Sequence, residues 1–275
     1  MTGYDAALAQ IDSWPVSRAA AAVVGPGGVL ATRGAIEDTF ALASVTKPLA
    51  ALAVLVAVEE GAVELTDPAD ESVVPGATLR HLLAHASGLA PEKPMRAAEP
   101  GARRIYSNVG IERAGELVAA GASMPFSAYF HEALVAPLGL TSTSLPGSPA
   151  RDGISSVADL ARVAHVVLTE SALLDPSTFA DARTVQYPGL RGVLPGFGPK
   201  TPNDWGLGFE IRGEKDPHWT GSANSTQTFG HFGQSGTMLW IDPLAQLALV
   251  ALTDRDFGPW AAQGWPALAD AVLAS

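Results

Sequence analysis

The segment Ala43-Ser44-Val45-Thr46-Lys47-Pro48, together with the apolar run 49–58 that follows it, decides how this chain folds. Proline lacks an amide proton and fits only the first turn of a helix, so Pro48 predicts a helix that begins at or just before Ser44. The run 49–58 has no polar residue on any face, which is typical of a buried helix, and it is too short to cross a membrane. The sequence therefore predicts a central helix that presents Ser44 and Lys47 at its tip.

Ser44 and Lys47 lie three residues apart, so on a helix their side chains share one face. A hydroxyl is a poor nucleophile until another group takes its proton, and a desolvated lysine is able to do so. Ser44 at a helix N-terminus would also stand where free amides and the helix dipole favour negative charge. Taken alone, the pair fits equally well an N-capping serine and a solvated lysine.

The composition limits the classes of protein to which the chain can belong. A length of 275 residues with 47% hydrophobic residues indicates a folded globule. The net charge of −11 argues against nucleic acid or an anionic membrane as a partner. The chain has no cysteine, which excludes disulfides and thiol chemistry. The N-terminal residues show no basic and apolar leader pattern, so we expect a cytoplasmic protein.

Hydrophobic periodicity predicts strands at both ends of the chain and helices between them. Residues 19–24 and 29–33 form a hairpin around a Gly-Pro-Gly-Gly turn, and strands follow over 208–211, 228–233, 238–241 and 247–252. We therefore expect a mixed α/β protein in which the N-terminal hairpin completes an antiparallel sheet with the C-terminal strands. The predicted sheet domain comprises residues 1–43 and 195–275, and the helical domain comprises 44–194. Glycine and proline mark a long loop over 187–204, and a closing helix is expected over roughly 266–273.

Two further motifs join the serine–lysine pair: Tyr106-Ser107-Asn108 in a loop between helices, and His231-Phe232-Gly233 on a predicted strand. Their order resembles that of the serine β-lactamase-like hydrolases, which include class C β-lactamases, D-alanyl-D-alanine peptidases and esterases. The resemblance covers nearly the whole chain and is carried by segments 42–48, 79–89, 106–110, 137–140, 205–209 and 230–237. It implies an α/β domain packed on a helical domain, with the site between them.

The resemblance also implies a role for each motif residue. Ser44 is the expected nucleophile that forms an acyl-enzyme, and Lys47 and Tyr106 share the proton transfer. A tyrosine acts as a base near neutrality only if neighbouring cations depress its pKa, and Lys47 is the cation expected to do so. Either residue could be the resting base, because coupled groups titrate together. His231 occupies the place of a lysine in class C β-lactamases, which points towards peptidase or esterase relatives.

Four residues are expected to bind the substrate. Asn108 would hold the Lys47 ammonium and a substrate amide or ester, and the backbone amides of Ser44 and Gln234 would bind the oxyanion. Gly233 and Phe232 lie on the same strand motif. The family carries Thr or Ser at the position of Phe232, and the missing hydroxyl predicts a preference for neutral substrates over anionic ones. Alternatively, the ring points away into the packing of the sheet.

Each of these residues also has a purely structural interpretation: a satisfied core aromatic or histidine for Tyr106 and His231, and a helix cap for Asn108. His81 and His85 have metal-ligand spacing, but Leu82 stands where a zinc protease carries its glutamate. We interpret that pair as packing and expect no metal and no cofactor. The sequence thus predicts a serine esterase or amidase that acts on a small molecule. The alternatives are a weak β-lactamase or penicillin-binding peptidase, and a silent binding module.

Overall fold

Six strands from both ends of the chain form one antiparallel sheet in the computed structural model, which describes residues 2–275. The order from edge to edge is β2-β1-β10-β9-β8-β7, and Ala22 lies opposite Val250 where the N-terminal hairpin meets the C-terminal strands. The predicted hairpin and the predicted antiparallel sheet are therefore confirmed. The strands are β1 (Ala19–Gly25), β2 (Gly28–Arg33), β7 (Glu210–Ile211), β8 (Phe229–Gly233), β9 (Thr237–Asp242) and β10 (Leu247–Thr253).

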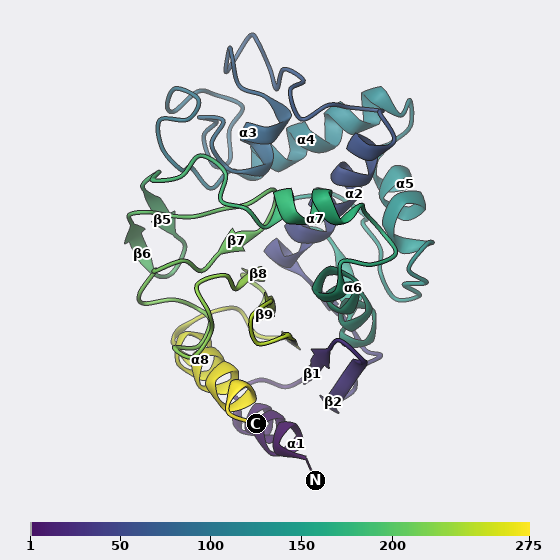
Figure 1. Ribbon diagram of the computed structural model, residues 1–275, viewed down its shortest axis with the longest axis vertical. Coiled ribbons are helices and arrows are strands. Elements are labelled where there is room, and N and C mark those ends of the chain that lie inside the picture. The colour runs from purple at the N-terminus through teal and green to yellow at the C-terminus, as the bar shows by residue number, and fades with distance from the viewer. Residues whose placement is uncertain (1) are drawn as a thin grey trace.

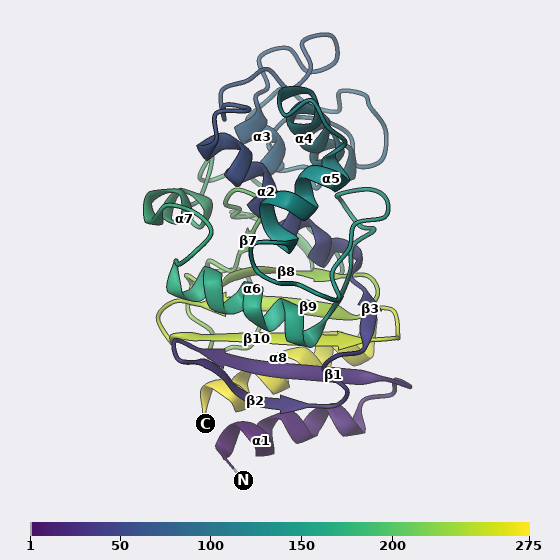
Figure 2. The same ribbon diagram turned by 90° about the vertical axis from the view of Figure 1, so that its right-hand side faces the viewer.

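Helices cover both faces of this sheet (Figure 2). On one face lie α1 (Gly3–Leu8), with the 3-10 turn Ala9–Ser13 after it, and α8 (Pro259–Leu273); on the other lies α6 (Val157–Thr169). Because successive strand residues point to opposite faces, β1 sends Val23 to the α1–α8 core and Val24 to the α6 core. Both faces are apolar, so the sheet forms the middle layer of three.

The helical part of the chain lies beyond the β7–β8 edge of the sheet (Figure 1). It contains α2 (Thr46–Glu59), α3 (Leu79–Leu83), α4 (Asn108–Gly121), α5 (Phe126–Phe130), the π-helical segment η3 (His131–Val135) and α7 (Pro176–Ala182). There are also two short two-stranded ladders: β3 (Thr39–Ala41) with the distant β4 (Ile154–Ser156), and the hairpin of β5 (Gly192–Leu194) with β6 (Gly198–Lys200). The predicted division at residues 44 and 195 stays a prediction, and α6, inside the predicted helical range, packs on the sheet.

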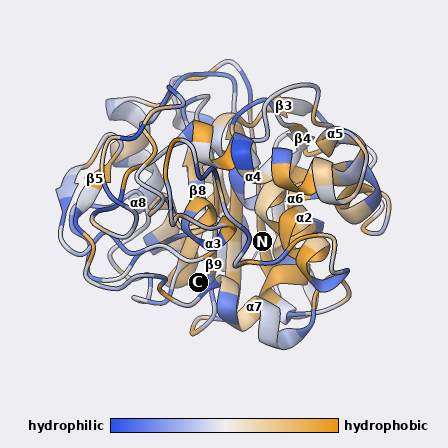
Figure 3. Ribbon diagram, turned by 90° about the horizontal axis from the view of Figure 1, so that it is seen from above, coloured by the Kyte–Doolittle hydropathy of each residue, from blue (hydrophilic) through white to orange (hydrophobic). Residues whose placement is uncertain are grey.

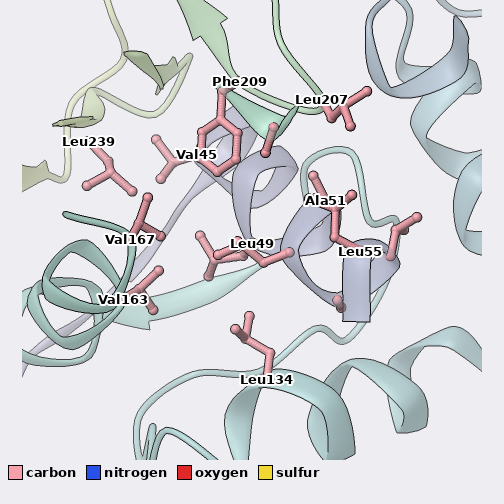
Figure 4. Packing of buried hydrophobic residues seen from close by; sticks show 14 of the residues in the cluster. Val45, Leu49, Ala51, Leu55, Leu134, Val163, Val167, Leu207, Phe209 and Leu239 are labelled. Carbon is pink, nitrogen blue, oxygen red and sulfur yellow. The ribbon is translucent and has the colours of Figure 1, made fainter. Parts of the chain in front are cut away.

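Helix α2 runs through the centre of the molecule and is buried along most of its length. In Figure 4, Leu49, Ala51 and Leu55 point into a core that receives side chains from α6, from η3 and from the β7–β9 edge of the sheet. Gly208, with a positive φ of 83°, approaches α2 so closely that a Cβ there would lie 2.0 Å from Ala51 Cβ. Figure 3 shows the same concentration of hydrophobic residues around α2 and α6, with more polar loops at the periphery.

The start of α2 follows the predicted pattern. A single 3-10 turn, η2 (Ala43–Val45), carries Ser44 and leads directly into α2, so Pro48 occupies the third position of the helix, where no amide proton is needed. In α8 the outcome differs from the prediction. The predicted helix over 266–273 begins earlier, at Pro259, and Pro266 lies inside it. In the part of the chain that the structure describes, no helix has both the length and the apolar character needed to cross a lipid bilayer.

Candidate active site

Lys47 is the second residue of α2, directly after the turn that carries Ser44, and its side chain is fully buried. Its Nζ lies 3.2 Å from Ser44 Oγ, 2.6 Å from Asn108 Oδ1 and 2.8 Å from the carbonyl oxygen of Ala150. A neutral amine has two protons and one lone pair, and the two protons match the two carbonyl-type acceptors. The lone pair is then left for the Ser44 hydroxyl.

The electrostatics of the site favour that neutral form. Burial disfavours the charged ammonium and is the main reason that the pKa of Lys47 falls to about 7. The negative charge of Glu92 raises this pKa, and the positive charge of Arg151 lowers it further. A lysine with an ordinary pKa would be almost wholly protonated at neutral pH. At neutral pH, Lys47 is therefore divided between its charged and neutral forms.

Tyr106 contacts the same serine from the other side. Its hydroxyl donates to Ser44 Oγ at 2.6 Å, and His231 Nε2 lies 3.1 Å from the Tyr106 hydroxyl oxygen. The backbone amide of Phe232 donates to His231 Nδ1 at 2.8 Å, which assigns the ring proton to Nε2. Burial lowers the pKa of His231 to about 3, so the ring is neutral at physiological pH and donates to Tyr106.

The expectation that Lys47 depresses the pKa of Tyr106 is wrong in this structure. Burial raises the pKa of the Tyr106 phenol well above its ordinary value, and the hydrogen bond with Ser44 offsets this only in part. The Lys47 Nζ does lie over the Tyr106 ring, 4.5 Å from its centre, but it makes no hydrogen bond to the hydroxyl within residues 2–275. Of the two candidate bases, only Lys47 has a neutral, proton-accepting form near pH 7.

His85 and Trp205, to which the sequence reading assigned no role in the site, hold Tyr106 in place. The His85 carbonyl accepts from the amide of Ile105, and its ring Nδ1 accepts from the amide of Ser107, so the residues on both sides of Tyr106 are fixed. The His85 ring centre lies 4.8 Å from that of Tyr106 and 4.5 Å from that of Trp205. His85 therefore has the packing role that we expected, and the residues that it packs against include Tyr106 of the site.

Phe232 does not lie beside Ser44, and its prediction as a substrate-binding residue is wrong. Its ring is 5% exposed and belongs to the core between the sheet and α8, with ring centres 5.8 Å away at both Trp219 and Trp265. On a strand, neighbouring side chains face opposite ways, so His231 faces the site and Phe232 faces α8. The preference for neutral substrates was expected because Phe232 would line the site, and this position of the ring removes that reason.

The end of β8 lies against the chain just before Ser44. Thr237 Oγ1 donates to the carbonyl of Leu42 at 2.7 Å, and a Cβ at Gly233 would lie 2.3 Å from that same carbonyl oxygen. This close approach requires glycine at position 233. It also brings Gln234, the next residue, beside the serine turn, where the two backbone amides are predicted to bind an oxyanion.

The remaining site predictions divide between chemistry and packing. Ser107 caps α4 by accepting from the amide of Gly110, so Asn108 is not the cap, and its side chain bonds to Lys47. His81 accepts from the amide of Thr78 and stacks on a tyrosine ring. Among residues 2–275 no group of three or more potential metal ligands comes together.

The protein has an antiparallel sheet between layers of helices and a helical block beyond one edge of that sheet. Ser44, Lys47 and Tyr106 come together in the site. This arrangement is the β-lactamase/transpeptidase-like fold. The chain belongs to the Beta-lactamase family, whose sequence model matches residues 16–274. Members of this family are typically serine hydrolases.

Several solved structures share the fold. A β-lactamase from Mycobacterium bovis is 56% identical, with 98% of each chain covered and a TM-score of 0.95. Simvastatin synthase from Aspergillus terreus is 18% identical, with 98% of this chain and 94% of that chain covered and a TM-score of 0.78. A protein of Escherichia coli O157:H7 assigned as a D-alanyl-D-alanine carboxypeptidase is 26% identical over 58% of this chain. The chain spans about half the length of the curated relatives that it matches, 47% in this case.

Proposed function

We propose that this protein is a serine hydrolase that cleaves a small ester or amide through an acyl-enzyme on Ser44. The observation that carries the proposal is that two proton-transfer groups, Lys47 Nζ and the Tyr106 hydroxyl, both lie within hydrogen-bond distance of one hydroxyl, Ser44 Oγ. Ser44 is only half-buried, so a substrate is able to reach it. A satisfied structural serine would need neither partner buried beside it.

In this proposal Lys47 is the base. Its neutral amine takes the Ser44 proton as Oγ attacks the carbonyl carbon, and the carbonyl electron pair moves to oxygen, where the Ser44 and Gln234 amides bind it. The resulting ammonium is stabilised by Asn108 Oδ1, the Ala150 carbonyl and the face of the Tyr106 ring.

Tyr106 then acts as the acid. When the tetrahedral intermediate collapses, the carbon–oxygen or carbon–nitrogen bond breaks, and the leaving atom takes the Tyr106 proton, so that Tyr106 is left as a phenolate beside the Lys47 ammonium. The neutral His231 donates to the Tyr106 oxygen throughout and stabilises the charge that develops there. Water then attacks the acyl-enzyme by the same steps in reverse and releases the acid.

The second candidate function is hydrolysis of β-lactams, favoured by the 56% identity to the Mycobacterium bovis protein described as a β-lactamase. His231 in place of the class C lysine supports the esterase or amidase function, and the cytoplasmic location stays a prediction. A binding module of another class would keep the fold without acylation of Ser44.

The test is acylation of Ser44. A fluorophosphonate probe should add its mass to the peptide that contains Ser44, and a p-nitrophenyl ester should release a burst of p-nitrophenol. The Ser44→Ala variant should lose both signals, whereas Ser13→Ala, at an exposed serine on the far side of the sheet, should keep them. Turnover of the ester by Ser44→Ala within a few fold of wild type would contradict the proposal. Parallel assays with a chromogenic cephalosporin separate the two candidate functions.

A further inference from the structure

A cavity of about 710 Å³ opens at Tyr106, the residue that contacts the nucleophile. Its lining comes from the chain that leads into Tyr106 and from the β5–β6 hairpin. Much of the lining is apolar. The apolar side chains are Pro91, Ile105, Val193, Pro195 and Pro199.

Backbone pairing brings cationic residues together around this cavity. The amide of Arg104 donates to the carbonyl of Arg191, which places Arg103 and Arg191 on adjoining segments. Gly192, the next residue, pairs with Lys200 in the β5–β6 ladder. Arg103, Arg191 and Lys200 all line the cavity, Arg103 from the chain before Tyr106 and the other two from the β5–β6 hairpin segment.

None of these three side chains has an anionic partner in the part of the chain that the structure describes. The ion pairs there involve nine other cationic side chains, in a protein of net charge −11. Lys200 is only 7% exposed, and its Nζ makes no hydrogen bond within residues 2–275. Three cationic side chains without an ion-pair partner make the electrostatic potential of this cavity more positive.

Arg104, the fourth basic residue of the lining, differs from these three because its side chain is hydrogen-bonded within the protein. Arg104 is 3% exposed and turns its guanidinium away to the carbonyl oxygens of Ala84, Gln186 and Asn203. These hydrogen bonds connect three chain segments beside the cavity and leave Arg104 few donors for a ligand. The charge available to a ligand therefore comes from Arg103, Arg191 and Lys200.

The acidic groups nearby do not neutralise the cavity. Glu92 pairs with Arg151 and accepts from Asn108 on the Lys47 side of the site. Glu210 pairs with Lys215 and His218 in the protein interior. Asp216 acts on Lys200 through space but forms no ion pair with it.

We propose that this cavity is a subsite for a carboxylate carried by one arm of the substrate, with Arg103, Arg191 and Lys200 as the groups that bind it. The inference rests on the proposed hydrolase function, because it assigns the arm that extends from the reacting carbonyl past Tyr106. The apolar lining accommodates the carbon chain of that arm, and the cations meet its end. The preferred substrate is then an anionic ester or amide, contrary to the expectation drawn from Phe232.

Three chromogenic esters test this and identify the arm. Mono-p-nitrophenyl adipate carries the carboxylate on the acyl arm, 3-hexanoyloxy-4-nitrobenzoate carries it on the leaving arm, and p-nitrophenyl hexanoate is the neutral reference. We expect kcat/KM for one anionic ester to exceed that of the reference by about tenfold or more, and 0.5 M NaCl to reduce the difference. If neither anionic ester is preferred, the inference is overturned.

Variants of the cavity then assign the residues. Arg103→Gln/Arg191→Gln, at two exposed positions, should lower the anionic-to-neutral ratio of kcat/KM by about tenfold, and Lys200→Gln should lower it on its own. The control is Arg33→Gln, which removes the same charge at β2, the far edge of the sheet, and should leave the ratio unchanged. A ratio that the cavity variants do not lower overturns the inference.

Calorimetry with adipate supplies a readout that needs no turnover. Adipate should bind wild type more tightly than it binds the double variant, and equal affinities overturn the inference. Loss of all ester hydrolysis together with no Ser44 adduct is a different result, which refutes the proposed function. Hydrolysis without preference for an anionic ester refutes only the subsite.

Discussion

Two charged side chains outside the catalytic hydrogen bonds, Glu92 and Arg151, act on the pKa of Lys47 in opposite directions. Burial brings that pKa to about 7, Glu92 raises it and Arg151 lowers it. The acylating form has a neutral Lys47, so the acylation rate should rise through pH 7 and level off above it. Glu92→Gln should therefore move the midpoint to lower pH, and Arg151→Gln should move it to higher pH.

The size of the shift follows from the geometry at Asn108. Its amide accepts from Lys47 at 2.6 Å and donates to Glu92 at 2.5 Å, so the two charges lie roughly 7 Å apart. Such a pair interacts by about 2 kcal/mol at an effective dielectric constant near 20. Because the Glu92 side chain is 57% exposed, solvent reduces this to about 1 kcal/mol. We expect a shift of about 0.7 pH unit for Glu92→Gln.

The assay is the second-order rate of acylation by a p-nitrophenyl ester, measured by stopped flow from pH 5 to pH 9. At pH 6, Glu92→Gln should acylate about fourfold faster than wild type, and Arg151→Gln should acylate more slowly. Glu116→Gln, an exposed carboxylate on α4, is the matched control and should keep the wild-type midpoint. Midpoints that stay fixed, or that move in the same direction in both variants, would refute the assignment of Lys47 as the base.

Three further predictions concern the rest of the site and the core. Tyr106→Phe should lower the maximal rate of ester hydrolysis by about a hundredfold, the usual scale of acid–base catalysis, and an unchanged maximal rate would show that Tyr106 only packs in the site. Phe232→Thr should lower the free energy of unfolding by about 3 kcal/mol in urea melts and reduce all activities together, whereas a switch towards anionic esters would place the ring in the site. Glu210→Gln leaves Lys215 without its buried partner and should cost about 3 to 5 kcal/mol, while the exposed Glu214→Gln should cost almost nothing.

Local chemistry was enough to predict much of the fold. Pro48 and the apolar residues after it predicted where α2 begins and that it is buried, and both are confirmed. The glycine-rich turn between β1 and β2 predicted the hairpin. The side of β8 that faces the site was not predictable, because every residue of this strand is buried and its pattern shows no polar face. Phe232 and His231 could therefore have faced either way from the sequence alone.

The parts of the site that sequence reading missed are backbone groups and long-range contacts. The Ala150 carbonyl that binds Lys47 is present in every residue type, so no side chain marks it. The raised pKa of Tyr106 depends on its burial, which the loop around it did not reveal. Arg103 lies far in the sequence from the other two cations of the cavity, Arg191 and Lys200, and the β5–β6 ladder beside these two lies in a stretch predicted as a loop.

The burial of α2 has a consequence for how this protein loses activity on heating. In many enzymes the catalytic groups stand on loops that melt locally, so inactivation precedes global denaturation. Here Ser44 lies on a turn continuous with α2, Lys47 lies in the first turn of this largely buried helix, and neither leaves its position unless the helix does. The thermal inactivation curve and the calorimetric melting curve should therefore coincide, so the remaining activity should equal the fraction of molecules with a folded core.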